Sequence, residues 1–191
     1  MTPPSTSVVR GSARHRLKRW QCAPGSLTAH LNRTYADRGG IRVRVLPVRR
    51  PATAWERRQI GARPGEALWL REVALCCGDE VLVHARSVAQ VRATRLMWRC
   101  LLGLGSRAMA EVLFAPRRTP LSRTPLRALA RPVAGCGGNQ GPHVPARQRD
   151  QSVSLTGGRC SVFGRAGASL LVSEWFSSAI RRLKKLGSTR A

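Results

Sequence analysis

With 191 residues, the chain is long enough for one domain with a modest core, and its hydrophobic content of 42% argues against wholesale disorder. Its longest apolar runs fall far short of the roughly 20 residues that a membrane-spanning helix needs, so no transmembrane segment is predicted. Lys and Arg number 34 against 9 for Asp and Glu, and the formal net charge of +25 favours anionic partners such as small acids, acidic membrane surfaces or nucleic acid.

The N-terminal part of the chain begins with a basic segment that lacks the apolar centre of a secretory signal. We expect this leader, residues 1–24, to be disordered. Residues 27–31 then form a short helix candidate, because Ser26 can cap the first turn with its hydroxyl. The strict alternation of residues 41–45 predicts a half-buried strand whose three β-branched residues face the core.

Two antiparallel hairpins give the strongest strand signal. Residues 67–75 and 81–88 are strand-like runs on either side of Gly78-Asp79, a pair that favours a tight turn. Residues 161–176 predict a second hairpin that turns at Ala166-Gly167. A largely antiparallel sheet follows from these two units.

Between the hairpins, apolar spacing predicts helices over residues 94–104 and 108–113. The apolar face of the first helix is formed by Leu96, Met97, Cys100, Leu101 and Leu104. Residues 115–160 differ in character, because Pro, Gly and Arg dominate and periodicity is lost. We interpret the centre of this region, about residues 131–157, as a disordered insertion or a stretch of degraded coding sequence.

The predicted organisation is therefore one α+β domain over residues 25–180, preceded by the basic leader and followed by a basic tail over residues 181–191. The six Cys form no C-x-x-C pair and the four His are not at zinc-ligand spacing, so we expect free thiols and no metal site.

Two charged residues interrupt the apolar pattern of the predicted strands. Arg71 shares a strand face with Trp69, Val73 and Leu75, and Glu174 lies in the same way among apolar residues of the last strand. A charge on an apolar face is costly unless it is paired or binds a ligand. From spacing alone, a structural ion pair, an exposed strand face and a ligand site all remain open.

Four stretches of the chain resemble motifs of bacterial chorismate lyases. Residues 69–76, WLREVALC, resemble the W-L-R-E-[IV]-x-L-C strand of that family, and residues 104–114 resemble its L-G-x-x-P-L-G-x-x-L-F segment. Residues 158–163 with 170–176 resemble R-R-S-x-[FL] and P-L-L-[VL]-T-E-x-F, and Ser26-Leu-Thr resembles S-[ML]-T. Order and spacing agree over about residues 25–130 and 158–177.

The resemblance implies a single antiparallel sheet whose covering helices enclose an internal pocket. It also implies a carbon–oxygen lyase that eliminates pyruvate from chorismate and leaves 4-hydroxybenzoate for ubiquinone biosynthesis in the cytoplasm. The family uses no metal and no coenzyme. We expect a monomer whose partners are chorismate and 4-hydroxybenzoate, with no obligatory nucleic acid.

By the same resemblance, the catalytic residues are Arg71 and Glu174, and the substrate-binding residues are Leu27, Arg71, Met109 and Glu174. A guanidinium can hold a carboxylate through two parallel hydrogen bonds, and amides at helix N-termini are anion-binding donors. We expect Arg71 and the amides of Leu27 and Met109 to bind the ring carboxylate, with Glu174 near the ring hydroxyl.

The chain departs from the family pattern at several positions. Ala108-Met109-Ala110 stands in place of P-L-G, Gly167-Ala-Ser in place of Gly-x-Pro, and Ser177-Ser178 in place of L-P. A copy that has lost activity is therefore an alternative. A non-catalytic effector-sensing domain of the same fold, which binds small aromatic acids, would also fit these motifs, and the charge alone would fit an Arg-rich nucleic-acid-binding protein.

Overall fold

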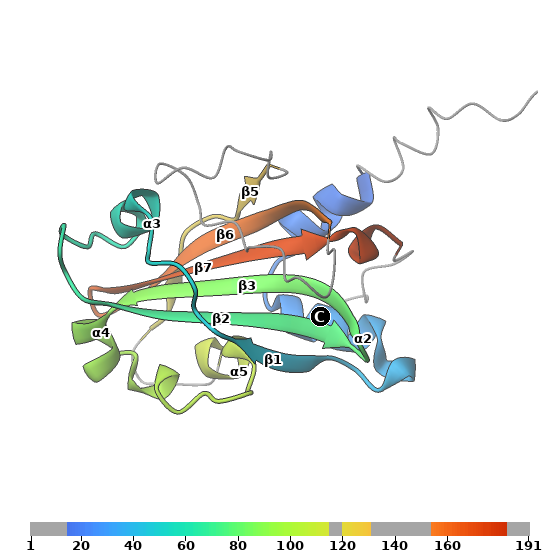
Figure 1. Ribbon diagram of the computed structural model, residues 1–191, viewed down its shortest axis with the longest axis horizontal. Coiled ribbons are helices and arrows are strands. Elements are labelled where there is room, and N and C mark those ends of the chain that lie inside the picture. Colours follow the sequence, from blue (N-terminus) through green and yellow to red (C-terminus); the bar gives the residue numbers. More distant parts are fainter. Residues whose placement is uncertain (1–14, 115–119, 131–153, 183–191) are drawn as a thin grey trace, which may run out of the picture.

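The computed structural model describes residues 15–114, 120–130 and 154–182, and it has one antiparallel β-sheet at its centre (Figure 1). The sheet has seven strands in the order β1-β2-β3-β7-β6-β4, and β5 also pairs with β6. Its strands are β1 Arg42–Leu46, β2 Leu68–Cys77, β3 Glu80–Gln90, β4 Ser122–Arg123, β5 Arg127–Leu129, β6 Leu155–Arg165 and β7 Ala168–Ser177. The predicted α+β class with a single antiparallel sheet is confirmed.

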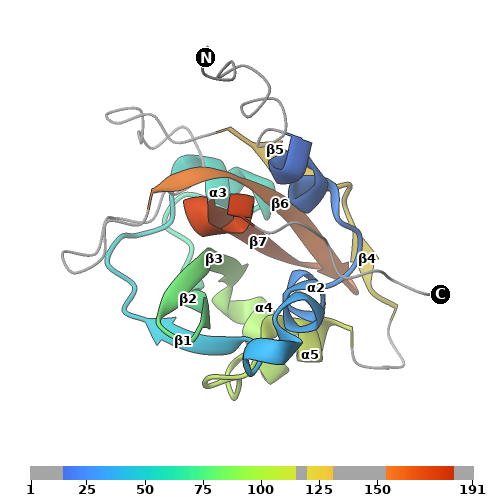
Figure 2. The ribbon, with the colours of Figure 1, turned by 90° about the vertical axis from the view of Figure 1, so that its right-hand side faces the viewer.

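The helices are short and lie on both faces of the sheet. They are α2 Leu27–Thr34, α3 Ala54–Gln59, α4 Val91–Arg95 and α5 Met109–Leu113, with 3-10 turns at Ala36–Arg38, Arg99–Leu101 and Ser178–Arg182. Figure 2 shows the sheet curving around α2 and α5, which lie on its concave side, while α3 lies on the other side. The predicted helices at residues 27–31 and 108–113 are confirmed. No helix among the described residues is long and apolar enough to cross a membrane.

The two predicted hairpins form the centre of the sheet. Strands β2 and β3 turn at Gly78, which has a φ of 56°, and β6 and β7 turn at Ala166-Gly167, where φ is 45° and 76°. A positive φ at both central residues suits a two-residue hairpin turn. Pairing of β3 with β7 then joins the hairpins edge to edge, with Ala85 opposite Glu174.

The convex face of the sheet carries α3, a helix that the sequence analysis did not predict. Thr53 caps this helix in a reciprocal pair with Glu56, a T-x-x-E signature that is present in the sequence. Glu56 is fully buried and accepts from Arg86 on β3, which also donates to Glu72 and to the carbonyl of Pro51. This buried cluster fixes the loop before α3 against the sheet.

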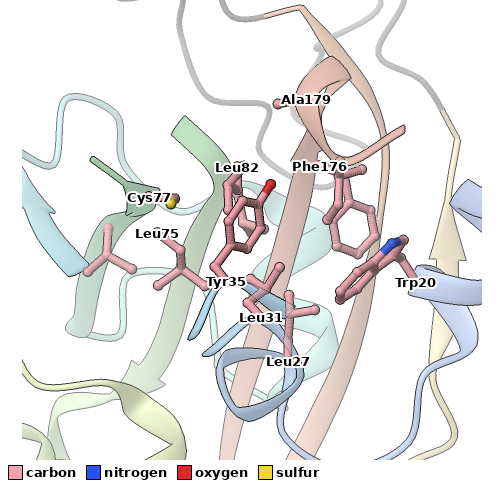
Figure 3. Close-up of a cluster of buried hydrophobic side chains, with 12 residues drawn as sticks. Trp20, Leu27, Leu31, Tyr35, Leu75, Cys77, Leu82, Phe176 and Ala179 are labelled. Carbon is pink, nitrogen blue, oxygen red and sulfur yellow. The ribbon is translucent and has the colours of Figure 1, made fainter. Parts of the chain in front are cut away.

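The expected disordered leader is wrong for the part of it that the structure describes. Residues 15–22 are helical, and Trp20 is 1% exposed. Its indole packs in one apolar cluster with Leu27 and Leu31 of α2 and with Phe176 of β7 (Figure 3). Trp20 therefore helps to dock a basic helix that composition alone assigned to solvent. Residues 1–14 lie outside the described part.

The predicted helix over residues 94–104 is also wrong. The chain leaves helical geometry at Leu96, and both Leu96 and Met97 are exposed. Leu101 and Leu104 of the predicted apolar face are buried, and with the buried Trp98 they follow a spacing of three that suits tight turns rather than an α-helix. Trp98 is fully buried and its Nε1 donates to the carbonyl of Ala168, which explains why the backbone turns here.

Two further expectations need correction. Val45, expected in the core, is 51% exposed, because β1 lies at the edge of the sheet, with β2 as its one partner among the described strands. The expected insertion ends earlier than residue 157, since β6 starts at Leu155 and the flanking β4 and β5 pair with it. These long-range pairings have no local signature. Residues 131–153 and the tail beyond residue 182 lie outside the described part.

Replacing Trp20 by Ala tests whether the helix at residues 15–22 belongs to the core. Removal of a buried Trp side chain should lower the free energy of unfolding by about 3–5 kcal/mol. Chemical denaturation measures this change, and Lys18→Ala, on the exposed side of the same helix, serves as the control. Equal stability of the two variants would restore the leader interpretation.

His84 predicts a pH dependence of stability. Burial, together with the charge of Arg44, lowers the pKa of His84 from 6.5 to about 4. The folded protein therefore keeps this imidazole neutral while the unfolded chain protonates near pH 6.5, so stability is lost as the pH falls from about 6.5 towards 4. Denaturation curves between pH 7.5 and about 4.5 should show a smaller loss in His84→Leu than in the unmodified protein. Identical slopes would contradict the assignment.

Candidate functional site

A pocket lies between the concave face of the sheet and the N-terminal ends of α2 and α5. The space between its walls is about 630 Å³ when the open mouth is included. Its walls are largely apolar, and the residues that line its floor come from β2, β3, β7 and β6: Arg71, Val73, Leu75, Ala85, Ser87, Val172, Glu174, Arg159, Ser161 and Phe163. All four residues singled out in the sequence, Leu27, Arg71, Met109 and Glu174, line this one pocket.

Strand register explains why Arg71 and Glu174 point into the same space. Arg71 lies opposite Ser87, which lies opposite Val172, and Glu174 follows two residues later on the same face of β7. Two strand spacings across the sheet and two residues along it separate their Cα atoms by roughly 12 Å. The two side chains do not form an ion pair with each other. The interpretation of these two charges as each other's partner is therefore wrong.

The Arg71 guanidinium is held by backbone carbonyls rather than by a carboxylate. Its Nη2 donates to the carbonyls of Gly105 and Arg107, both at 2.9 Å, in the loop before α5. The residue is 8% exposed, and burial lowers the pKa of Arg71 below its usual value, although a guanidinium remains charged at neutral pH. These contacts orient the group but leave its charge without an acidic partner among the described residues.

Glu174 has a partner that the sequence did not reveal. Nε of Arg159 on β6 donates to Oε2 of Glu174 at 2.5 Å, and Nη1 of Arg159 donates to the carbonyl of Ala23. The two residues are direct cross-strand neighbours, and Arg159 is 1% exposed. Arg159 therefore fixes the Glu174 carboxylate in one orientation at the pocket wall.

Leu27 and Met109, the first residues of α2 and α5, line the pocket. Ser26 caps α2 by accepting from the amide of Ala29, and Glu111 accepts from the amide of Ala108 at the start of α5. First-turn amides of a helix have no intrahelical acceptor and are suited to bind an anion. The cap of α5 is therefore built without a side-chain acceptor at Ala108.

Arg123 is a second residue that sequence reasoning missed. It lies on β4, where its Nε donates to Oγ of Ser161 at 2.8 Å and its guanidinium stands 4.9 Å from the ring centre of Phe163. Burial, followed by the charge of Arg159, lowers the pKa of Arg123, and the charge of Glu174 opposes this effect. Arg123 falls in the segment that lacks periodicity, and Arg159 falls in a family motif to which no site residue was assigned. Neither was therefore distinguished from the remaining arginines of the chain.

The electrostatic character of the pocket follows from these groups. Of the residues that the structure describes, three guanidinium groups and one carboxylate line the pocket, so the fixed charge of this described lining is positive. Among the described residues, no cluster of His, Cys, Asp and Glu is arranged to hold a metal ion. The arrangement suits a small acidic molecule that also carries a hydroxyl group.

Comparisons with known proteins point to one family. No protein-family model matches the chain. A protein of Azoarcus sp. (strain BH72) named probable chorismate pyruvate-lyase is 37% identical over 182 residues, which cover 88% of this chain and 87% of that protein. Proteins with that name from Aromatoleum aromaticum, at 34% identity with 88% of each chain covered, and from Pseudomonas fluorescens, at 31% with 91% and 86% covered, agree with it.

Solved structures show weaker likenesses. The possible transcriptional regulator YydK of Bacillus subtilis gives a TM-score of 0.45 at 8% identity, covering 79% of this chain and 62% of that one. The ligand-binding domain of a putative GntR-family regulator from Bordetella bronchiseptica gives 0.39 at 18%, covering 72% and 83%. Both are too distant to bear on function.

Gly158 tests how closely β6 and β7 must approach beside Glu174. A Cβ at Gly158 would lie 2.3 Å from the backbone oxygen of Glu174, so Gly158→Ala must displace one strand. We expect a loss of about 1–3 kcal/mol in the free energy of unfolding. Gly103→Ala is the matched control, because an added Cβ there meets nothing within 4 Å. A Gly158→Ala protein as stable as the control would show that the strands tolerate separation here.

Proposed function

The chain belongs to the chorismate pyruvate-lyase family, and on that premise we propose that it eliminates pyruvate from chorismate and leaves 4-hydroxybenzoate. The observation that carries this proposal is a single pocket in which Arg71 and the Arg159-bound Glu174 project from separate strands on either side of β3. A cytoplasmic role in supplying 4-hydroxybenzoate for ubiquinone biosynthesis is part of the same proposal.

Substrate binding begins with the ring carboxylate. The Arg71 guanidinium has no acidic partner among the described residues, and it is already oriented by two carbonyls, so little conformational freedom is lost when it binds an anion. The amides at Leu27 and Met109 add uncharged donors from the other side of the pocket. Together they hold the carboxylate end of the ring.

The hydroxyl end of the ring lies at Glu174. Because one carboxylate oxygen accepts from Arg159, the other is left to accept a hydrogen bond from the hydroxyl on C4 of chorismate. Arg159 is a positioning residue in this scheme, since it acts through Glu174. The distance between Arg71 and Glu174 across β3 suits an aromatic hydroxy acid held at both ends.

The reaction itself breaks two bonds of the ring. The C4–H bond is lost, its electron pair forms the third ring double bond, and the C3–O bond breaks to release enolpyruvate. The C4 proton balances the gain of one proton by the enolpyruvyl group as it becomes pyruvate. Aromatisation drives the step, and the pocket contributes by restraining chorismate in a reactive conformation away from water.

The test is to incubate the full chain with chorismate while pyruvate and 4-hydroxybenzoate are measured together. We expect the two products in a one-to-one ratio. Arg71→Met should lower kcat/KM by at least about 10- to 100-fold and weaken 4-hydroxybenzoate binding similarly, because charge-assisted hydrogen bonds are lost. Glu174→Ala should also lower kcat/KM, because the hydroxyl end is no longer held.

Arg99→Met is the control for these variants, because it removes the same charge from an exposed position outside the pocket. It should leave turnover unchanged. Binding of 4-hydroxybenzoate without any turnover of chorismate would overturn the proposed lyase activity. Full activity in both Arg71→Met and Glu174→Ala would overturn the site.

A further inference from the structure

Two positive charges in the pocket contact no carboxylate among the described residues. The charge of Arg159 is matched by Glu174, at 2.5 Å. Arg71, in contrast, donates to backbone carbonyls, and Arg123 donates to the Ser161 hydroxyl and to the carbonyl of Gly25. Charged groups in a largely apolar pocket are costly unless an opposite charge joins them. The pocket is therefore suited to a ligand with two negative charges.

The two unmatched guanidinium groups come from strands that lie far apart in the sheet order. Arg71 comes from β2, whereas Arg123 comes from β4, the last strand in the sheet order β1-β2-β3-β7-β6-β4. Glu174 on β7 lies between them in that order. Through its contact with Ser161, the Arg123 guanidinium reaches the row of residues next to the Arg159–Glu174 pair. The effects of Arg159 and Glu174 on its pKa agree with this proximity.

We propose that Arg123 binds the enolpyruvyl carboxylate of chorismate, an inference that rests on the proposed function. The enolpyruvyl ether is attached to the ring carbon beside the one that carries the hydroxyl. With the ring carboxylate at Arg71 and the hydroxyl at Glu174, the ether points towards the part of the pocket next to Glu174. Arg123 is the guanidinium without a carboxylate partner in that part of the described pocket.

This assignment separates substrate from product. The ring carboxylate and the hydroxyl remain in 4-hydroxybenzoate, but the second carboxylate leaves with pyruvate. Arg71 is therefore a contact for both molecules, whereas Arg123 is a contact for chorismate and for the departing three-carbon acid. Loss of Arg123 should weaken the binding of chorismate and leave the binding of 4-hydroxybenzoate unchanged.

The experiment compares Arg123→Met with the unmodified chain by calorimetric titration of three stable ligands. They are 4-hydroxybenzoate, 3-(carboxymethoxy)-4-hydroxybenzoate, which carries a second carboxylate beside the hydroxyl, and 3-propoxy-4-hydroxybenzoate, its uncharged counterpart. The unmodified chain should bind the dicarboxylate at least about tenfold more tightly than the uncharged ether, because a charge-assisted contact is added. Arg123→Met should lose this preference and change the Kd of 4-hydroxybenzoate by less than about threefold.

Two variants control for charge and for folding. Arg127→Met removes the same charge from β5, where Arg127 is exposed and does not line the pocket, and it should keep the preference. Arg123→Lys retains the positive charge and should keep part of the preference. Thermal unfolding of each variant shows that it is folded before titration.

The outcomes separate this inference from the proposed function. The role of Arg123 would be overturned if Arg123→Met kept the preference for the dicarboxylate. It would also be overturned if this variant lost as much affinity for 4-hydroxybenzoate as for the dicarboxylate, which would show that Arg123 only supports the start of α2 through Gly25. If the unmodified chain prefers the dicarboxylate but does not convert chorismate, the lyase proposal fails and the subsite stands. If the unmodified chain converts chorismate, but Arg123→Met has the same kcat/KM and the same preference for the dicarboxylate, the lyase proposal stands and the subsite at Arg123 fails.

Discussion

Pairing of β3 with β7 is the constraint on which the pocket depends. Each hairpin is local in sequence, but the ladder that joins them sets Ala85 opposite Glu174 and Ser87 opposite Val172. Because side chains alternate between faces, a slip of one residue would turn Glu174 away from Arg71 and towards the α3 side. The buried Arg86, on the α3 side of β3, accordingly has its acidic partners in Glu56 and Glu72 and none in the pocket. One register thus separates two charged sites on opposite faces of one sheet.

Much of the fold and half of the charged site could be predicted from the sequence, and the reason is periodicity. The two hairpins alternate with period two, and Arg71 and Glu174 were visible as charges at positions where that period requires apolar residues. Arg159 and Arg123 gave no such contrast. Arg159 lies among glycines at the start of β6, and Arg123 lies on a strand of two residues whose existence depends on pairing with that distant strand. In a chain with 34 basic residues, identity alone could not distinguish them.

Two of the wrong expectations, the disordered leader and the helix over residues 94–104, share one physical cause, which is that a buried Trp outweighs the local pattern. Trp98 is buried at the expense of Leu96 and Met97, which helical spacing had assigned to the core. Trp20 holds a basic helix that its composition assigned to solvent. A Trp side chain buries more apolar surface than any other residue, so its position decides the course of a weakly helical segment. Composition over a window averages out this effect.

The helix at residues 15–22 has a practical consequence for the design of expression vectors. Nε2 of Gln21 donates to the carbonyls of Leu129 and Gly158, and the carbonyl of Ala23 accepts from Arg159. A recombinant version begun at residue 25 would delete all three contacts. It would leave Nη1 of Arg159, the residue that positions Glu174, without its acceptor in the wall of the pocket. Trimming the amino terminus would thus alter the binding site.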